Sequence, residues 1–91
     1  MTLEECRELI DGIDRELVGL LRTRLSVSEK VAEYKIANGL PTYDKTREDA
    51  LLSRISEMAG SDREAILVIY RAILETSRAR QELLRGGTEN G

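Results

Sequence analysis

An apolar stripe along the first third of the chain constrains the fold more than any other feature. Apolar side chains recur there at alternating steps of three and four residues, which is the spacing that places them on one face of an α-helix. The members of the stripe are Leu3, Cys6, Ile10, Ile13, Leu17, Leu20, Val27, Val31 and Tyr34. No proline precedes Pro41, so the pattern predicts one helix of about 35 residues, which would be about 52 Å long.

The rest of this 91-residue chain is too short to cover such a helix. A compact domain of this length has a radius of gyration of about 12 Å and measures only about 30 Å across. We therefore predict an all-α, intertwined homodimer, in which a second copy of the chain covers the stripe by twofold symmetry. Gly12 and Gly19 lie on one face of the long helix. They are either tolerated there or allow another helix to approach closely.

Capping patterns divide the chain into a long first helix and two shorter ones. The expected signals, in chain order, are the capping box Thr2–Glu5, the stop Asn38-Gly39, the N-cap Asp44, the stop Gly60, and a second capping box at Ser61–Glu64. The Gly-rich and polar residues 86–91 are expected to form a disordered tail after a domain at residues 1–85.

Composition excludes several classes of protein. The net charge of −3 argues against a nucleic-acid binder, which normally carries a basic face. No apolar run approaches the roughly 20 residues that span a bilayer, and no signal peptide is visible, so we expect a cytoplasmic protein without membrane contact. With Cys6 as its one cysteine and with no histidine, the chain is expected to hold no metal.

Polar side chains interrupt the apolar stripes of all three predicted helices. Arg24 occupies a stripe position, and a guanidinium buried there without a partner would cost several kcal/mol. Lys35 lies on nearly the same face, about 16 Å further along the helix. The other inward polar residues are Ser28, Asp44, Arg47, Glu48, Ser77 and Gln81. Together these residues predict an enclosed, cation-rich pocket between the helices.

Three of these polar residues also have a structural interpretation. Arg24 could pair with Glu48, Lys35 could extend to solvent, and Ser77 could bond to its own helix. The coincidence of several such residues favours a binding site. Because the sequence shows no nucleophile–base pair and no phosphate-binding loop, the pocket suits a dianionic substrate and catalysis by electrostatics and positioning.

The full set of signatures then points to a family. They are Arg7-Glu8, Ile13-Asp14, Leu20-Leu21, Arg24, Lys35, Asp44, Arg47-Glu48, Ser77 and Gln81. With these residues in register over positions 3–85, the chain resembles the small all-α chorismate mutases, such as the mutase domain of bifunctional chorismate mutase–prephenate dehydratase. The resemblance implies that residues 1–85 form a chorismate mutase domain. This isomerase would rearrange chorismate to prephenate in phenylalanine and tyrosine biosynthesis, as a homodimer that needs no cofactor.

The resemblance also implies roles for the cationic and amide side chains. Arg24 would bind a substrate carboxylate, and Arg7 would bind a carboxylate in the other protomer's site. Lys35 would contact a carboxylate and the ether oxygen, and Gln81 would donate to that same oxygen. Arg7 and Arg24 are about 25 Å apart on one helix, so one small substrate could touch both only if they came from different chains.

The remaining site residues have roles that are implied in the same way. Glu48 and Asp44 would hold the ring hydroxyl, Ser77 would help to fix a carboxylate, and Arg47 would line the site. The residues expected to act in catalysis are Arg24, Lys35, Glu48 and Gln81.

Two other functions stay open at this point. An isochorismate pyruvate lyase would use the same scaffold, but the cluster of Asp44, Arg47 and Glu48 resembles the mutases more closely. A noncatalytic helical dimerisation module would explain the apolar stripes, but it would not explain the inward polar residues.

Overall fold

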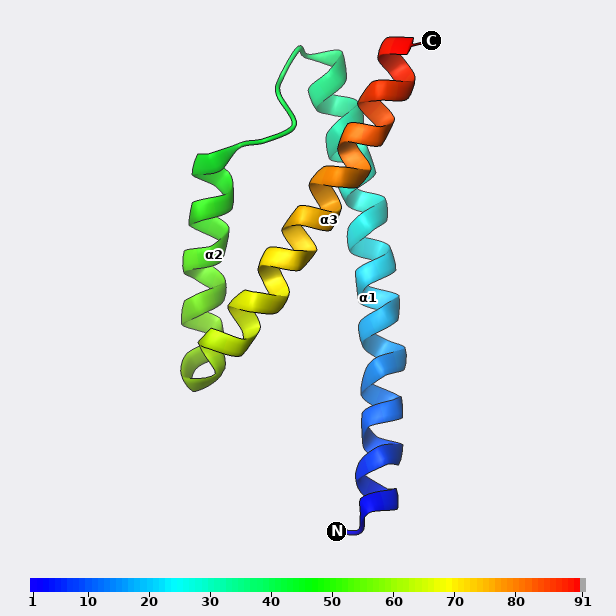
Figure 1. Cartoon of the computed structure of the whole chain (residues 1–91), viewed down its shortest axis with the longest axis vertical. Helices are drawn as coiled ribbons and strands as arrows, with labels where there is room; N and C mark the ends of the chain where they lie inside the picture. The colour runs from blue at the N-terminus through cyan, green and yellow to red at the C-terminus, as the bar shows by residue number, and fades with distance from the viewer. Residues whose placement is uncertain (91) are drawn as a thin grey trace.

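The chain is helical throughout the part that the structure describes. This computed structural model describes the backbone of residues 1–90 and the side chains of residues 1–86. Helix α1 spans Leu3–Ala37, α2 spans Lys45–Ala59 and α3 spans Arg63–Asn90, with a short 3-10 turn, η1, at Gly60–Asp62 (Figure 1). The predicted all-α fold is confirmed. Over the same residues, no helix has the length and apolar character needed to cross a bilayer.

The expected boundary after residue 85 is not visible in the backbone. Helix α3 continues to Asn90, although the Gly-rich composition of residues 86–91 predicts a disordered tail. Residue 91 and the side chains from residue 87 onward lie outside the described residues. Disorder of the tail therefore stays a prediction.

Helix α3 holds the other two helices together. It packs against both α1 and α2, whereas within residues 1–90 no Cα atom of α1 lies within 8 Å of one in α2. Figure 1 shows α3 running from the end of α2 to the C-terminal half of α1. Each helix contributes one buried apolar side chain to this packing, namely Ala32, Ile55 and Leu74. Such a small core provides little apolar burial for one chain.

The N-terminal half of α1 extends beyond the other helices (Figure 1). Its stripe is uncovered, with Ile13 61% and Leu20 69% exposed. The radius of gyration is 16.5 Å, whereas a compact chain of this length has one of about 12 Å. The exposed large apolar side chains of α1 are Leu3, Leu9, Ile10, Ile13, Leu17, Val18, Leu20, Val27, Val31 and Tyr34. A single chain therefore leaves the predicted stripe without cover.

Side-chain caps fix the starts of α1 and α2. The backbone N–H of Glu5 donates to Thr2 Oγ1 at 3.1 Å, and the N–H of Arg47 donates to Asp44 Oδ1 at 3.0 Å. Each bond satisfies a donor that the first turn of a helix leaves free. Both predicted N-caps are confirmed.

The second predicted capping box is wrong in its placement. Ser61 lies inside η1, and α3 begins at Arg63. Gly60 ends α2 with a φ of 58°, a value that favours glycine. The backbone then tightens into a 3-10 turn before it resumes an α-helix, which is common at helix ends.

The end of α1 is a Schellman motif. The N–H of Leu40 donates to the carbonyl of Lys35 at 2.8 Å, and the N–H of Gly39 donates to the carbonyl of Ile36 at 3.3 Å. Gly39 has a φ of 66°, which costs a residue with a Cβ atom about 1–2 kcal/mol. The motif turns the chain into the loop of residues 38–44, which leads to α2.

Replacing Gly39 by Ala is therefore expected to lower the free energy of unfolding by about 1 kcal/mol. Urea denaturation at a fixed protein concentration measures the change. Gly39→Asn is the matched control and should cost less, because asparagine tolerates the left-handed conformation. A Gly39→Ala variant as stable as the wild type would contradict the proposed importance of this conformation.

Candidate functional site

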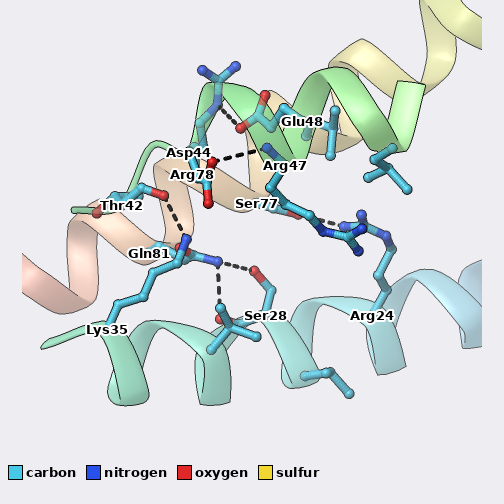
Figure 2. A pocket seen from close by; sticks show the side chains of 14 residues that line it. Arg24, Ser28, Lys35, Thr42, Asp44, Arg47, Glu48, Ser77, Arg78 and Gln81 are labelled. Atoms are coloured by element: carbon cyan, nitrogen blue, oxygen red, sulfur yellow. Dashed lines mark hydrogen bonds and ion pairs between the residues drawn. The ribbon is translucent and has the colours of Figure 1, made fainter. Parts of the chain in front are cut away.

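A cleft of about 290 Å³ opens between α1, α2 and α3, beside the loop of residues 38–44. Its lining residues are Arg24, Val27, Ser28, Val31, Lys35, Thr42, Asp44, Arg47, Glu48, Leu51, Leu74, Ser77, Arg78 and Gln81 (Figure 2). Apart from Arg7, every residue predicted for the site lies in this lining. Sequence positions that are up to 57 residues apart (24 and 81) thus meet in one place.

The α1 side of the cleft carries two cations, each with a neutral partner. Arg24 Nη1 donates to Ser77 Oγ on α3 at 3.0 Å, and Lys35 Nζ donates to the backbone carbonyl of Thr42 at 2.8 Å. Arg24 therefore does not form the pair with Glu48 that the sequence left open, and Lys35 bonds to the loop. Neutral oxygens orient both groups but do not cancel their charge.

Gln81 connects α3 to α1 at the bottom of the cleft. The side chain is buried, and its Nε2 donates to Ser28 Oγ at 2.8 Å and to the Ser28 carbonyl at 3.2 Å. Its buried Oε1 has no hydrogen-bond partner among the described residues. A buried polar atom left in this state costs about 1–3 kcal/mol, and such atoms occur at sites that a ligand or a water completes.

The α2 side of the cleft carries the two carboxylates. Asp44 caps α2 through Oδ1, and Glu48 forms an ion pair with Arg78 of α3, with 3.3 Å between Oε2 and Nε. Arg78 also places its guanidinium carbon 4.9 Å from the centre of the Tyr43 ring, a cation–π contact. The sequence analysis missed Arg78, although its position three residues before Gln81 places it near the inward face of α3.

The loop of residues 38–44 is fixed from α3 as well as from α1. Arg85 Nε donates to Thr42 Oγ1 at 3.1 Å, and Arg85 Nη2 donates to the Leu40 carbonyl at 2.6 Å. Thr42 is buried and its carbonyl accepts the bond from Lys35. The sequence analysis missed Thr42 too, because its role comes from a backbone carbonyl in a loop.

The charged groups give the cleft a surplus of positive charge. Four cationic side chains and two anionic ones line it, so two positive charges are uncompensated. The cations are Arg24, Lys35, Arg47 and Arg78, and the anions are Asp44 and Glu48. A concave site with this surplus attracts a small dianion.

Arg7 lies apart from this group. It belongs to the exposed N-terminal half of α1 and is absent from the cleft lining. The helical rise places it about 25 Å from Arg24. One chain therefore does not bring all the predicted site residues together.

The ion pair of Lys45 and Asp49 lies outside the cleft. The pKa of Lys45 is raised, chiefly because its ammonium donates a hydrogen bond to Asp49 one turn further along α2. Both side chains are mostly exposed and neither lines the cleft, so their pairing concerns the surface of α2.

Comparison with known proteins gives the family. The profile of the family described as chorismate mutase type II matches residues 6–82. The chain belongs to the type II chorismate mutase family. This confirms the predicted family and the predicted enzyme activity, that of a chorismate mutase.

Curated relatives agree with the family match. The chain is 31% identical to the chorismate mutase of Methanocaldococcus jannaschii, over 97% of this chain and 92% of that protein. It is 35% identical to the T-protein of Haemophilus influenzae, over 87% of this chain but 22% of that protein. It is 29% identical to the bifunctional chorismate mutase/prephenate dehydratase of Aquifex aeolicus, over 91% of this chain but 25% of that protein. No solved structure matches significantly.

The geometry at Gln81 generates a prediction. Ser28→Ala removes the hydroxyl that accepts from Gln81 Nε2 and should lower the free energy of unfolding by about 1 kcal/mol, the net value of one hydrogen bond. Chemical denaturation measures the loss. Ser26→Ala is the control, because Ser26 is exposed on the same helix and its loss should change stability by less than about 0.5 kcal/mol. Equal stabilities of the two variants would contradict the anchoring role.

Proposed function

We propose that this chorismate mutase converts chorismate to prephenate in the cytoplasm, within the cleft between α1, α2 and α3. The main support is the surplus of two positive charges in the lining, which matches the two carboxylates of the substrate. The rearrangement is unimolecular, so it requires positioning and charge stabilisation and no covalent participation of the protein.

Lys35 and Gln81 are the proposed donors to the ether oxygen. As the C–O bond of chorismate breaks, negative charge develops on this oxygen, and donors already in place stabilise the transition state more than the ground state. An ammonium has three N–H groups, so Lys35 can keep its bond to the Thr42 carbonyl and still donate to the substrate. Gln81 would exchange its bond to Ser28 Oγ for one to the ether oxygen.

Arg24 is the proposed ligand of a substrate carboxylate. Its bond to Ser77 uses Nη1, which leaves Nε–H and Nη2–H for a paired contact with a carboxylate. Arg47 would line the site beside it. Glu48 and Asp44 would accept from the ring hydroxyl, since both are acceptors in a lining whose other charged groups are donors.

A second copy of the chain is proposed to complete each site. The uncovered stripe of α1 and the extended shape of one chain support an intertwined homodimer. If the two α1 helices pack antiparallel, Arg7 of one copy approaches Arg24 of the other. Arg7 would then bind the second substrate carboxylate.

Loss of either α1 cation should remove most of the activity. Arg24→Ala and Lys35→Ala are each expected to lower kcat/KM by at least about a hundredfold, because each removes a charged donor from the site. An assay that follows the loss of chorismate and the formation of prephenate measures kcat/KM.

The matched controls are Arg22→Ala and Lys30→Ala, at exposed positions on the same helix. Both should keep near-normal activity. Isochorismate serves as a control substrate and should release no pyruvate. Near-normal kcat/KM in Arg24→Ala or Lys35→Ala would refute the proposal.

Complementation tests the shared site. Arg7→Ala and Lys35→Ala chains should each be inactive, but a heterodimer of the two has one intact site. After full exchange of an equal mixture, half of the dimers are mixed, so activity should reach about a quarter of the wild-type value. Sedimentation should show a dimer for each variant and for the mixture. A purification tag on one variant should retain the other variant once the subunits have exchanged. Exchange without recovery of activity would show that Arg7 does not act across the dimer.

A further inference from the structure

Arg78 touches both ends of the segment that carries the cleft's carboxylates. Its Nε lies 3.3 Å from Glu48 Oε2 in the first turn of α2. Its guanidinium carbon lies 4.9 Å from the ring centre of Tyr43, the residue before the N-cap Asp44. Because no Cα atom of α2 lies within 8 Å of one in α1 among the described residues, contacts of this kind from α3 help to set how the carboxylates face the α1 cations.

Glu48 needs such a partner for an electrostatic reason. Its side chain is 17% exposed, and in the proposed function it lies beside a dianionic substrate. Like charges in a partly buried site repel one another, so an unpaired Glu48 would turn away from the substrate. Figure 2 shows the Arg78 guanidinium beside Glu48 and apart from Arg24 and Lys35. Arg78 therefore contacts Glu48 from outside the cluster that would bind substrate.

The free oxygen of Glu48 is well suited to a hydroxyl group. Glu48 Oε2 faces Arg78, and Asp44 Oδ1 is already engaged by the N–H of Arg47. A carboxylate accepts hydrogen bonds through both oxygens. Glu48 Oε1 is thus available to a hydroxyl when Oε2 is held in place.

We propose that Arg78 is a positioning residue, which fixes the Glu48 carboxylate in the cleft so that it can bind the ring hydroxyl of the substrate. This inference rests on the proposed function and goes beyond it, because Arg78 acts through Glu48 and not on the reacting atoms. The contact with Tyr43 keeps the guanidinium over the start of α2 and limits the directions from which it can pair.

A double-mutant cycle tests the dependence of Arg78 on Glu48. Arg78→Met should lower kcat/KM by about tenfold, mainly through a higher KM, because binding of the hydroxyl is weakened in the ground state and the transition state alike. In a Glu48→Gln background the same change should lower kcat/KM by less than about twofold, since no carboxylate is left to position. Arg78→Lys should recover part of the loss, because an ammonium pairs with a carboxylate but lacks the planar fork.

The matched control is Arg80→Met, two residues further along α3. Arg80 pairs with Glu29 at 2.7 Å and does not line the cleft. Its loss removes an ion pair between helices and should leave kcat and KM within about twofold of the wild type. Thermal unfolding of all variants separates a loss of folded protein, which lowers apparent kcat at constant KM, from a loss of positioning.

The outcomes separate this inference from the proposed function. A wild-type protein that does not convert chorismate refutes the proposed function. If the wild type is active but Arg78→Met lowers kcat/KM by the same factor with and without Glu48→Gln, the positioning role alone is overturned. A fall in kcat at constant KM in folded Arg78→Met also overturns it. If Arg78→Met does not fold, Arg78→Lys replaces it in the cycle, where coupling supports the inference and additivity overturns it.

Discussion

The cleft depends on α3, because α3 is the one described helix that packs against both of the others. In the described residues the backbones of α1 and α2 do not approach within 8 Å between Cα atoms, so the relative positions of the α1 cations and the carboxylates depend on α3 and the loop of residues 38–44. A short stretch of α3 makes the connections on both sides. Ser77 and Gln81 bond to α1, whereas Arg78 between them pairs with α2. A shift or rotation of this stretch would displace both halves of the cleft together.

The two α1 cations of the cleft, Arg24 and Lys35, are oriented without being neutralised. The sequence left Glu48 open as a partner for Arg24, but within the chain Arg24 bonds to the Ser77 hydroxyl, and Lys35 bonds to a backbone carbonyl. The ion pairs of the described residues involve Arg78, Arg80 and Lys45 instead. Fixed cations with neutral partners lose little when an anionic ligand arrives, since no internal salt bridge has to break first. This arrangement suits a site whose task is to hold charge in place.

Much of this structure follows from sequence patterns because its causes are local. The stripe of α1, the caps at Thr2 and Asp44, and the stop at Gly39 each depend on residues within a few positions of one another. Most of the cleft was predictable because a polar side chain at an inward helical position is costly to bury unless it meets a polar partner or a ligand.

The parts that sequence reasoning missed depend on contacts between distant segments. The pairing of Glu48 with Arg78 in place of Arg24 depends on how α2 packs on α3, and helical periodicity contains no information about that packing. Thr42 contributes to the cleft through its carbonyl, a group that every residue has, so its side chain gives no signal. The start of α3 was misplaced because the 3-10 turn after Gly60 competes with the capping pattern over the same residues.

The uncovered stripe of α1 has a consequence for how the chain folds. Helix α1 emerges before α2 and α3 during synthesis, so it forms before α3, the helix that packs against it. Even then, the large apolar side chains of its N-terminal half remain exposed, and most of the stability of a helix in a protein comes from packing of its apolar face. Closure of this half by a second copy would make the last folding step bimolecular. The rate of that step would then rise with protein concentration. A chain at low concentration would therefore spend longer with the apolar stripe of α1 exposed to solvent.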